Sequence, residues 1–140
     1  MKRTISLIIT VALALSLVFS LSSCREPEFP LEEATYKDGC ELGEGKNTYL
    51  LKVTAKGFDV TFTIKTDETN LGQALRKSGI VEGDESTYGL YIKTVNGVRA
   101  DYDLDGAYWA FLIDGEMSMG GVDDVNIEEG KIYELAYTAG

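Results

Sequence analysis

The chain contains no histidine, so it lacks the side chain on which most acid–base and metal chemistry near neutral pH depends. This excludes Ser-His-Asp and Cys-His nucleophiles and His-ligated zinc or haem. Only two cysteines are present, Cys24 and Cys40, which excludes a framework of several disulfides. The 13 basic residues are outnumbered by 23 acidic ones, and the formal charge of −10 argues against a nucleic-acid-binding protein, because phosphate contacts need a basic surface. No catalytic set can be assembled from what remains, and we therefore expect no enzyme and no cofactor.

The first 24 residues have the order of an export signal. A basic start is followed by the apolar run 5–20 and then by two serines directly before Cys24. A charged beginning and small residues before a cleavage site are typical of a secretory signal peptide. The segment resembles the bacterial lipoprotein signal, in which the cysteine carries a diacylglycerol. Because the apolar run is shorter than the ~20 residues that a membrane span needs, we expect residues 1–23 to be removed and Cys24 to be lipidated.

Lipidation of Cys24 would hold the protein at the extracytoplasmic face of the cell membrane, with the membrane as the partner of the anchor. Two acyl chains on one residue are sufficient for stable anchoring. Removal of residues 1–23, which carry two basic residues and no acid, changes the formal charge from −10 to −12. Residues 24–47 are acidic and contain both prolines and three glycines, which predicts a flexible tether. Residues 48–140 then form one domain.

Two strands open this domain. Residues 49–54 are rich in apolar and β-branched side chains, and residues 58–66 alternate between apolar and polar side chains. Alternation with a period of two indicates a half-buried strand, and on this register Phe62 faces the core. Lys56-Gly57, between the two runs, predicts a hairpin turn.

One helix follows the hairpin, and strands resume after it. Asn70 is suited to cap a helix, and Gly79 is suited to end it in a left-handed conformation. The later strands are expected at residues 90–95, 108–113 and 132–137. Asn-Gly and Asp-Gly pairs at positions 96–97 and 114–115 predict tight hairpin turns. The order predicts an α+β fold with a mixed, mostly antiparallel sheet and one packed helix.

Three acids near the middle of the domain have the spacing of a calcium loop. Asp101, Asp103 and Asp105, followed by Gly106, match the first half of an EF-hand loop. The bidentate glutamate of such a loop is missing, because Leu112 stands at its position. The three acids are therefore a weak calcium candidate, and the alternative is an acidic turn before a strand.

Aromatic and methionine side chains near turns are the candidates for ligand contact, because they offer flat and polarizable surfaces. In the strand 108–113 both faces are apolar, so this strand is either covered on both sides or presents one face to a ligand. The residues that we expect to bind the ligand are Tyr88, Gly89, Leu90, Tyr91, Tyr108, Trp109, Met117, Ser118 and Met119.

Four sequence blocks, at residues 88–98, 107–116, 120–124 and 127–131, carry a family resemblance. They resemble the C-terminal domain of the vitamin B12 carriers transcobalamin and intrinsic factor, and more closely a family of bacterial surface lipoproteins built around that domain. The resemblance implies a β-grasp-like fold. It also implies that the loops at Tyr88–Tyr91 and Glu116–Gly120 contact the ligand, as the corresponding loops of the carriers close over one side of cobalamin.

These observations predict a membrane-anchored lipoprotein that binds a small soluble ligand, such as the corrinoid cobalamin, and passes it to a membrane importer. The alternative is a cell-surface module for protein–protein interaction or adhesion, which would use a sheet edge or the aromatic loops. Neither hypothesis involves nucleic acid.

Overall fold

The computed structural model describes residues 34–140 of the chain. The signal peptide, Cys24 and the beginning of the tether lie outside these residues, and their assignment stays a prediction. Within residues 34–140, no helix combines the length and the apolar composition that crossing a membrane requires.

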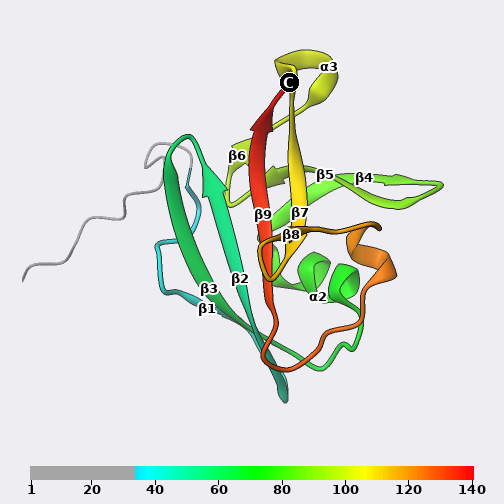
Figure 1. Cartoon of the computed structure of the whole chain (residues 1–140). Coiled ribbons are helices and arrows are strands. Elements are labelled where there is room, and N and C mark those ends of the chain that lie inside the picture. Colours follow the sequence, from blue (N-terminus) through cyan, green and yellow to red (C-terminus); the bar gives the residue numbers. More distant parts are fainter. Residues whose placement is uncertain (1–33) are drawn as a thin grey trace, which may run out of the picture.

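A six-stranded mixed sheet, in the order β1-β3-β2-β9-β7-β8, forms the larger part of the domain (Figure 1). Its strands are β1 (Glu41–Gly43), β2 (Asn47–Ala55), β3 (Phe58–Thr66), β7 (Ala107–Ile113), β8 (Glu116–Met117) and β9 (Ile132–Ala139). β1 runs parallel to β3 and β2 runs parallel to β9, whereas the other neighbours are antiparallel. The predicted α+β fold with a mostly antiparallel sheet is thus confirmed.

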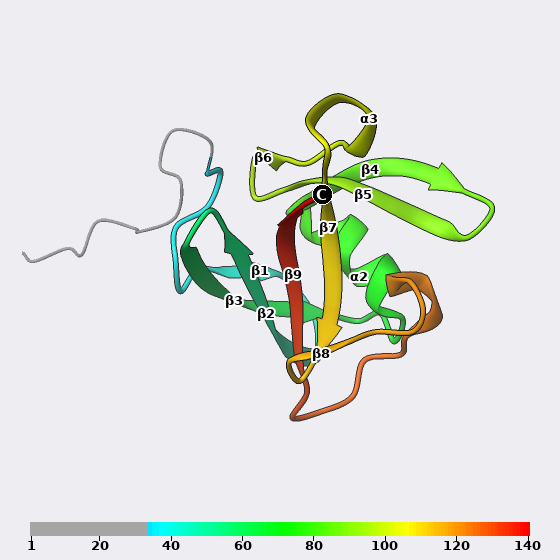
Figure 2. The ribbon, with the colours of Figure 1, turned by 45° about the horizontal axis from the view of Figure 1, so that its top comes forward.

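The helix α2 (Leu71–Ser78) covers one side of this sheet, next to the hairpin β4–β5 (Figures 1 and 2). It begins and ends where the sequence predicts. The Asn70 side chain accepts the backbone N–H of Gln73 at 3.1 Å, and Gly79 follows the helix with a left-handed φ of 73°. The helix buries Leu71 and Leu75 completely.

The predicted hairpin turns are confirmed by their backbone angles. Lys56 and Gly57, between β2 and β3, have φ values of 52° and 87°. The pairs at 96–97 and 114–115 likewise have two consecutive positive φ values. Two such residues define the tight turn whose twist matches that of antiparallel strands.

The core lies between the sheet, α2 and a second layer of strands. Phe62 faces Leu51 across the β2–β3 pair, and both are fully buried. Tyr133 of β9 lies among them and meets the ring of Tyr49 edge-on, with 5.6 Å between centroids. The alternation seen in residues 58–66 therefore places Val60, Phe62 and Ile64 inside, as expected, whereas Phe58 at the end of the strand remains 42 % exposed.

A second sheet corrects the expectation of a single one. It contains β4 (Val81–Ser86), β5 (Gly89–Val95) and β6 (Val98–Arg99), in that order. β4 was not expected because five of its six residues are exposed and most are polar. It forms by pairing with β5, with a bulge between Glu82 and Gly83. Two short helices, α3 (Tyr102–Asp105) and η2 (Val122–Asp124), complete the domain.

The domain also begins earlier than residue 48, which corrects the expected tether boundary. Thr35 and Tyr36 donate their backbone N–H groups to Asn96, whose side chain donates in return to the Tyr36 carbonyl at 3.0 Å. Asp38 accepts the N–H of Thr61 at 2.8 Å, and β1 then adds a parallel strand to β3. The segment docks because the exposed edge of β3 offers backbone partners, a tertiary feature that the composition of residues 34–47 does not reveal.

Candidate functional site

Two turns display large apolar side chains to solvent. Tyr88, at the tip of the β4–β5 hairpin, is 90 % exposed, and Met119, just after β8, is fully exposed. In Figures 1 and 2 the hairpin tip and the orange segment that contains η2 project on the same side of the molecule. Among the large apolar side chains of residues 34–140 these two are the most exposed, which makes the two turns a candidate contact surface.

Each of the two turns is held by a serine hydroxyl. The Ser86 hydroxyl donates to the carbonyl of Gly89 at 2.7 Å and accepts the N–H of Tyr88 at 3.2 Å. The Ser118 hydroxyl donates to the carbonyl of Gly120 at 2.9 Å and accepts its N–H at 3.3 Å. Local hydrogen bonds of this kind between a serine side chain and the backbone stabilise a turn.

Asp123 of η2 joins these turns. One of its carboxylate oxygens accepts the backbone N–H of Leu90 at 2.7 Å, directly beside the hairpin tip. Gly121, two residues before it in the chain, lies against the carbonyl of Tyr88, since a Cβ placed on Gly121 would be 3.7 Å from that oxygen. The hairpin tip and the segment after Met119 are therefore neighbours in space.

Arg76 of α2 completes this cluster. Its Nη1 and Nη2 donate to both oxygens of Asp123 at 2.5 and 2.8 Å, and its Nε and Nη2 donate to Glu85 of β4 at 2.8 and 2.9 Å. Hydrogen bonds to Asp123 and Glu85 raise the pKa of the guanidinium further, and the bond from Arg76 holds the pKa of Asp123 below its usual range. Because the planar guanidinium forms paired hydrogen bonds to two carboxylates, it holds α2, β4 and η2 in a fixed arrangement.

Other residues of the predicted ligand surface lie around these turns but face different ways. Leu90 packs against the core. Tyr91 is 40 % exposed on the face of β5 opposite to the buried Ile92, and the ammonium of Lys93 lies 5.9 Å from its ring centroid. Met117 is 61 % exposed and pairs with Leu112 on the face of the large sheet away from α2. The structure therefore places Tyr88 and Gly89 beside Gly121 and Asp123, shortly after Met119 in the chain, whereas Tyr91 and Met117 face other sides.

Trp109 and Tyr108 are set apart from this surface. Trp109 is only 8 % exposed, donates its indole N–H to the Lys93 carbonyl at 3.3 Å and meets Tyr137 edge-on at 5.8 Å. Tyr108 points to the opposite face of β7, where it pairs with Thr138. The second sheet covers the side of β7 on which Trp109 lies, so the structure places Trp109 in the core, and its contact with a ligand stays a prediction.

The three acids of the calcium candidate have protein partners. Asp101 caps α3 by accepting the N–H of Asp103 at 3.1 Å, and it lies 3.3 Å from the ammonium of Lys93. Asp105 accepts two N–H groups of Arg99 at 3.1 and 3.2 Å. Within residues 34–140 no three acidic or thiol side chains gather into a group that could hold a metal ion. The segment forms the short acidic helix α3 directly before β7, and the calcium candidate stays a prediction.

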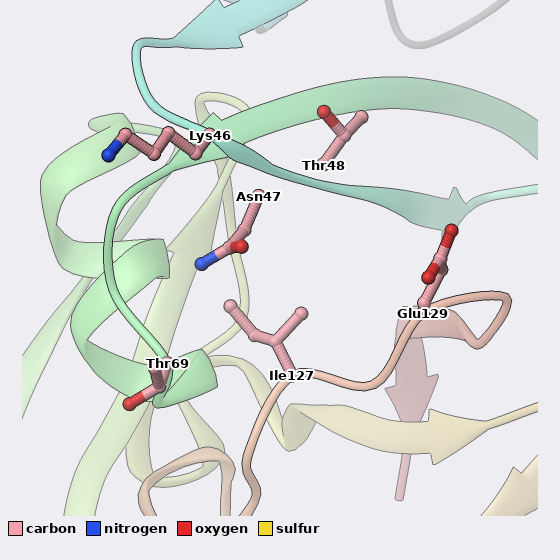
Figure 3. Close-up of a pocket in the computed structure, with 6 residues that line it drawn as sticks. All are labelled: Lys46, Asn47, Thr48, Thr69, Ile127 and Glu129. Atoms are coloured by element: carbon pink, nitrogen blue, oxygen red, sulfur yellow. The ribbon is translucent and has the colours of Figure 1, made fainter.

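A polar hollow of about 490 Å³ lies elsewhere, between the start of β2 and the loops that flank α2 and β9. Its lining residues are Lys46, Asn47, Thr48, Thr69, Ile127 and Glu129. Figure 3 shows the charged ends of Lys46 and Glu129 pointing away from each other, so the polar groups do not converge on one point. None of the predicted ligand residues lines this hollow, and the two turns remain the better candidate.

Sequence reasoning missed Arg76, Glu85 and Asp123 as parts of the site. Arg76 and Asp123 are 47 positions apart, and Glu85 lies in a strand without an alternating pattern. The one local signal was the run of residues 120–124, Gly-Gly-Val-Asp-Asp, which is one of the sequence blocks of the family resemblance.

Among solved structures, the chain is similar to a candidate metal-binding protein from Ruminococcus gnavus ATCC 29149, with 27% sequence identity and a TM-score of 0.62. That match covers 68% of this chain and 99% of the other. Haptocorrin in complex with Cbi also matches, with 18% identity and a TM-score of 0.49, over 66% of this chain and 25% of haptocorrin.

No curated protein matches the chain. A family model matches residues 68–139, just over half of the chain, and includes α2, both exposed turns and the Arg76–Asp123 cluster. The chain therefore belongs to the family described as the domain of unknown function DUF4430.

Proposed function

We propose that this protein is a lipid-anchored binding domain that captures a small ligand on the two exposed turns, without catalytic chemistry of its own. The observation that carries the proposal is the display of Tyr88 and Met119, which are almost wholly exposed at the apices of turns closed by serine hydroxyls. Because these hydrogen bonds already fix the backbone of the turns, a ligand that binds there has little backbone conformational entropy to overcome.

The shape and chemistry of these turns suit a flat or extended organic ligand. An aromatic ring and a thioether give broad dispersion contacts, and the Ser118 hydroxyl and nearby backbone groups can orient polar substituents. A corrinoid such as cobalamin has this combination of a flat conjugated ring and peripheral amides. The family resemblance supports the same ligand class, and a lipid on Cys24 would place the domain where it can deliver the ligand to a membrane importer.

The experiment for ligand binding is calorimetric titration of the purified protein with cobalamin and with cobinamide. We expect wild type to bind at least one of them, and Tyr88→Ala and Met119→Ala each to weaken binding by roughly tenfold. The melting temperature should stay nearly constant, because neither side chain packs in the core. Leu104→Ala removes a 71 % exposed apolar side chain from α3 and serves as the matched control with unchanged affinity.

A specific observation favours a second function if the titration fails. The face of the large sheet away from α2 exposes Leu50 and Ile132, which pair across β2 and β9 and are 40 % and 44 % exposed. Met117 adds a third apolar side chain to this face. Such a surface suits a protein–protein contact, and absence of heat from wild type at millimolar protein would leave the interaction module as the better explanation.

Anchoring is tested separately with Cys24→Ser. Because Cys24 is the one expected acylation site, this variant should leave the membrane fraction or accumulate as an uncleaved precursor. Cys40→Ser is the matched control, since it removes the other thiol and should fractionate like wild type. Metabolic labelling with a fatty acid and fractionation of cells provide the measurement. A processed, labelled and membrane-bound Cys24→Ser protein would refute the lipoprotein assignment.

A further inference from the structure

The carboxylate of Asp123 fills a space that two glycines leave open. A Cβ placed on Gly72 of α2 would lie 1.9 Å from one carboxylate oxygen, and a Cβ on Gly89 of β5 would lie 2.5 Å from the other. Gly89 has a positive φ of 95°, which by itself favours glycine, but Gly72 sits in a helix, where glycine is less favourable than alanine. The glycine at position 72 is therefore explained by the room that Asp123 needs.

The same carboxylate is held from three directions. Arg76 donates two hydrogen bonds from α2, and the N–H of Leu90 donates a third from β5. This N–H lies on the side of β5 away from β4, and β6 pairs with β5 only at Thr94 and Val95. In the described part of the chain, Asp123 thus takes the place of a further strand beside the first residues of β5.

The elements tied together are those that carry the exposed turns. Asp123 itself follows Met119 by four residues, Leu90 follows Tyr88 by two, and Arg76 also binds Glu85 on the other strand of the hairpin. The side chains of Asp123 and Arg76 are 25 % and 32 % exposed, so both are partly shielded from water. Charge-assisted hydrogen bonds in such surroundings are stronger than those at an open surface.

We propose that Asp123 is a positioning residue that latches the hairpin tip to the segment after β8 and so fixes the separation of Tyr88 and Met119. This role rests on the proposed ligand-binding function, and it assigns to Asp123 the control of ligand selectivity. Loss of the latch leaves both turns intact but lets them move apart, and ligands that contact both turns are then distinguished less well.

The first test uses Gly72→Ala, for which two explanations predict opposite signs. Helix propensity alone predicts a more stable protein, because alanine replaces glycine inside α2. The latch predicts a less stable one, because the new methyl group expels the carboxylate from its place. In an Asp123→Ala background the carboxylate is gone, and the remaining close neighbour of the added Cβ, Arg76 Nη1 at 3.0 Å, is the end of a flexible side chain that can move away. The same Gly72→Ala change should then become stabilising. Melting temperatures of the four proteins measure this reversal of sign.

The second test is hydrogen exchange at the backbone amide of Leu90. We expect the Leu90 amide to exchange at least about tenfold faster in Asp123→Ala and in Gly72→Ala. The exchange rate of the Leu51 amide in the core should not change. Asp105→Ala is the matched control. Asp105 likewise accepts hydrogen bonds from an arginine side chain and from a backbone N–H, but it lies in α3, away from the two exposed turns. A Gly72→Ala protein that is more stable than wild type and exchanges Leu90 at the wild-type rate overturns the latch.

The third test measures ligand selectivity by calorimetric titration. The ratio of the dissociation constants for cobinamide and cobalamin should change severalfold in Asp123→Ala and stay constant in Asp105→Ala. An unchanged ratio overturns the role in selectivity. If wild type binds neither probe, the proposed function and the selectivity role both fail, whereas the exchange rates still decide the latch.

Discussion

Replacement of Phe62 by alanine is expected to lower the free energy of unfolding by about 3–5 kcal/mol. Phe62 is fully buried at the centre of β3, faces Leu51 across the β2–β3 pair and belongs to the layer between the large sheet and α2. Removal of its ring loses the favourable free energy of burying a large apolar surface. It also leaves a cavity that the close-packed neighbours fill only in part. Urea unfolding followed by circular dichroism measures the loss as a shift in midpoint at constant slope.

Phe58 provides the control for this prediction. It lies in the same strand and in the same phase of alternation, but at the end of the strand it is 42 % exposed. Phe58→Ala should therefore cost about 1 kcal/mol or less. Equal urea midpoints for the Phe62→Ala and Phe58→Ala proteins would show that the register of β3 is wrong.

Trp109→Ala should cost a similar amount, about 3–5 kcal/mol, for a reason that only the structure supplies. Its ring fills the space between β7 and the second sheet, where it contacts Tyr137, and its indole N–H donates to the carbonyl of Lys93 in β5. The substitution thus weakens the attachment of one sheet to the other as well as emptying a core position. Since Trp109 is the one tryptophan of the chain, unfolding must be followed by circular dichroism.

The adjacent Tyr108 tests the orientation of this strand. It points to the other face of β7 and is 36 % exposed, so Tyr108→Ala should destabilise much less than Trp109→Ala. We also expect Trp109→Phe to recover most of the stability, because it restores apolar volume without the N–H donor. A Trp109→Ala protein as stable as wild type, with reduced ligand binding, would instead place Trp109 in the ligand site.

The elements that the sequence predicts correctly are those specified by neighbouring residues. The cap at Asn70 and the left-handed Gly79 define α2 through bonds and backbone angles within one turn. The turn at Lys56-Gly57 and the alternation of the strand after it define the β2–β3 hairpin in the same local way.

The elements that the sequence does not predict depend on partners far along the chain. β4 is polar and becomes a strand because β5 offers it backbone hydrogen bonds, and residues 35–43 join the domain because Asn96 and the edge of β3 receive them. Without knowledge of this second layer, nothing in residues 107–113 tells which face of the strand is covered. The fate of Trp109 was therefore open until the fold was known.

The sequence by itself determined the fold class, the local turns and the absence of histidine chemistry, since composition, capping and period-two patterns act over a few residues. Only the tertiary structure decided that Asp123 joins α2 to the hairpin tip and that the two exposed turns are neighbours. The physical reason is that the hydrogen-bond partners of a side-chain carboxylate follow no periodic pattern and no fixed separation along the sequence. Its partners, Arg76 at a distance of 47 positions and Leu90 at 33, are selected by the packing of elements in space.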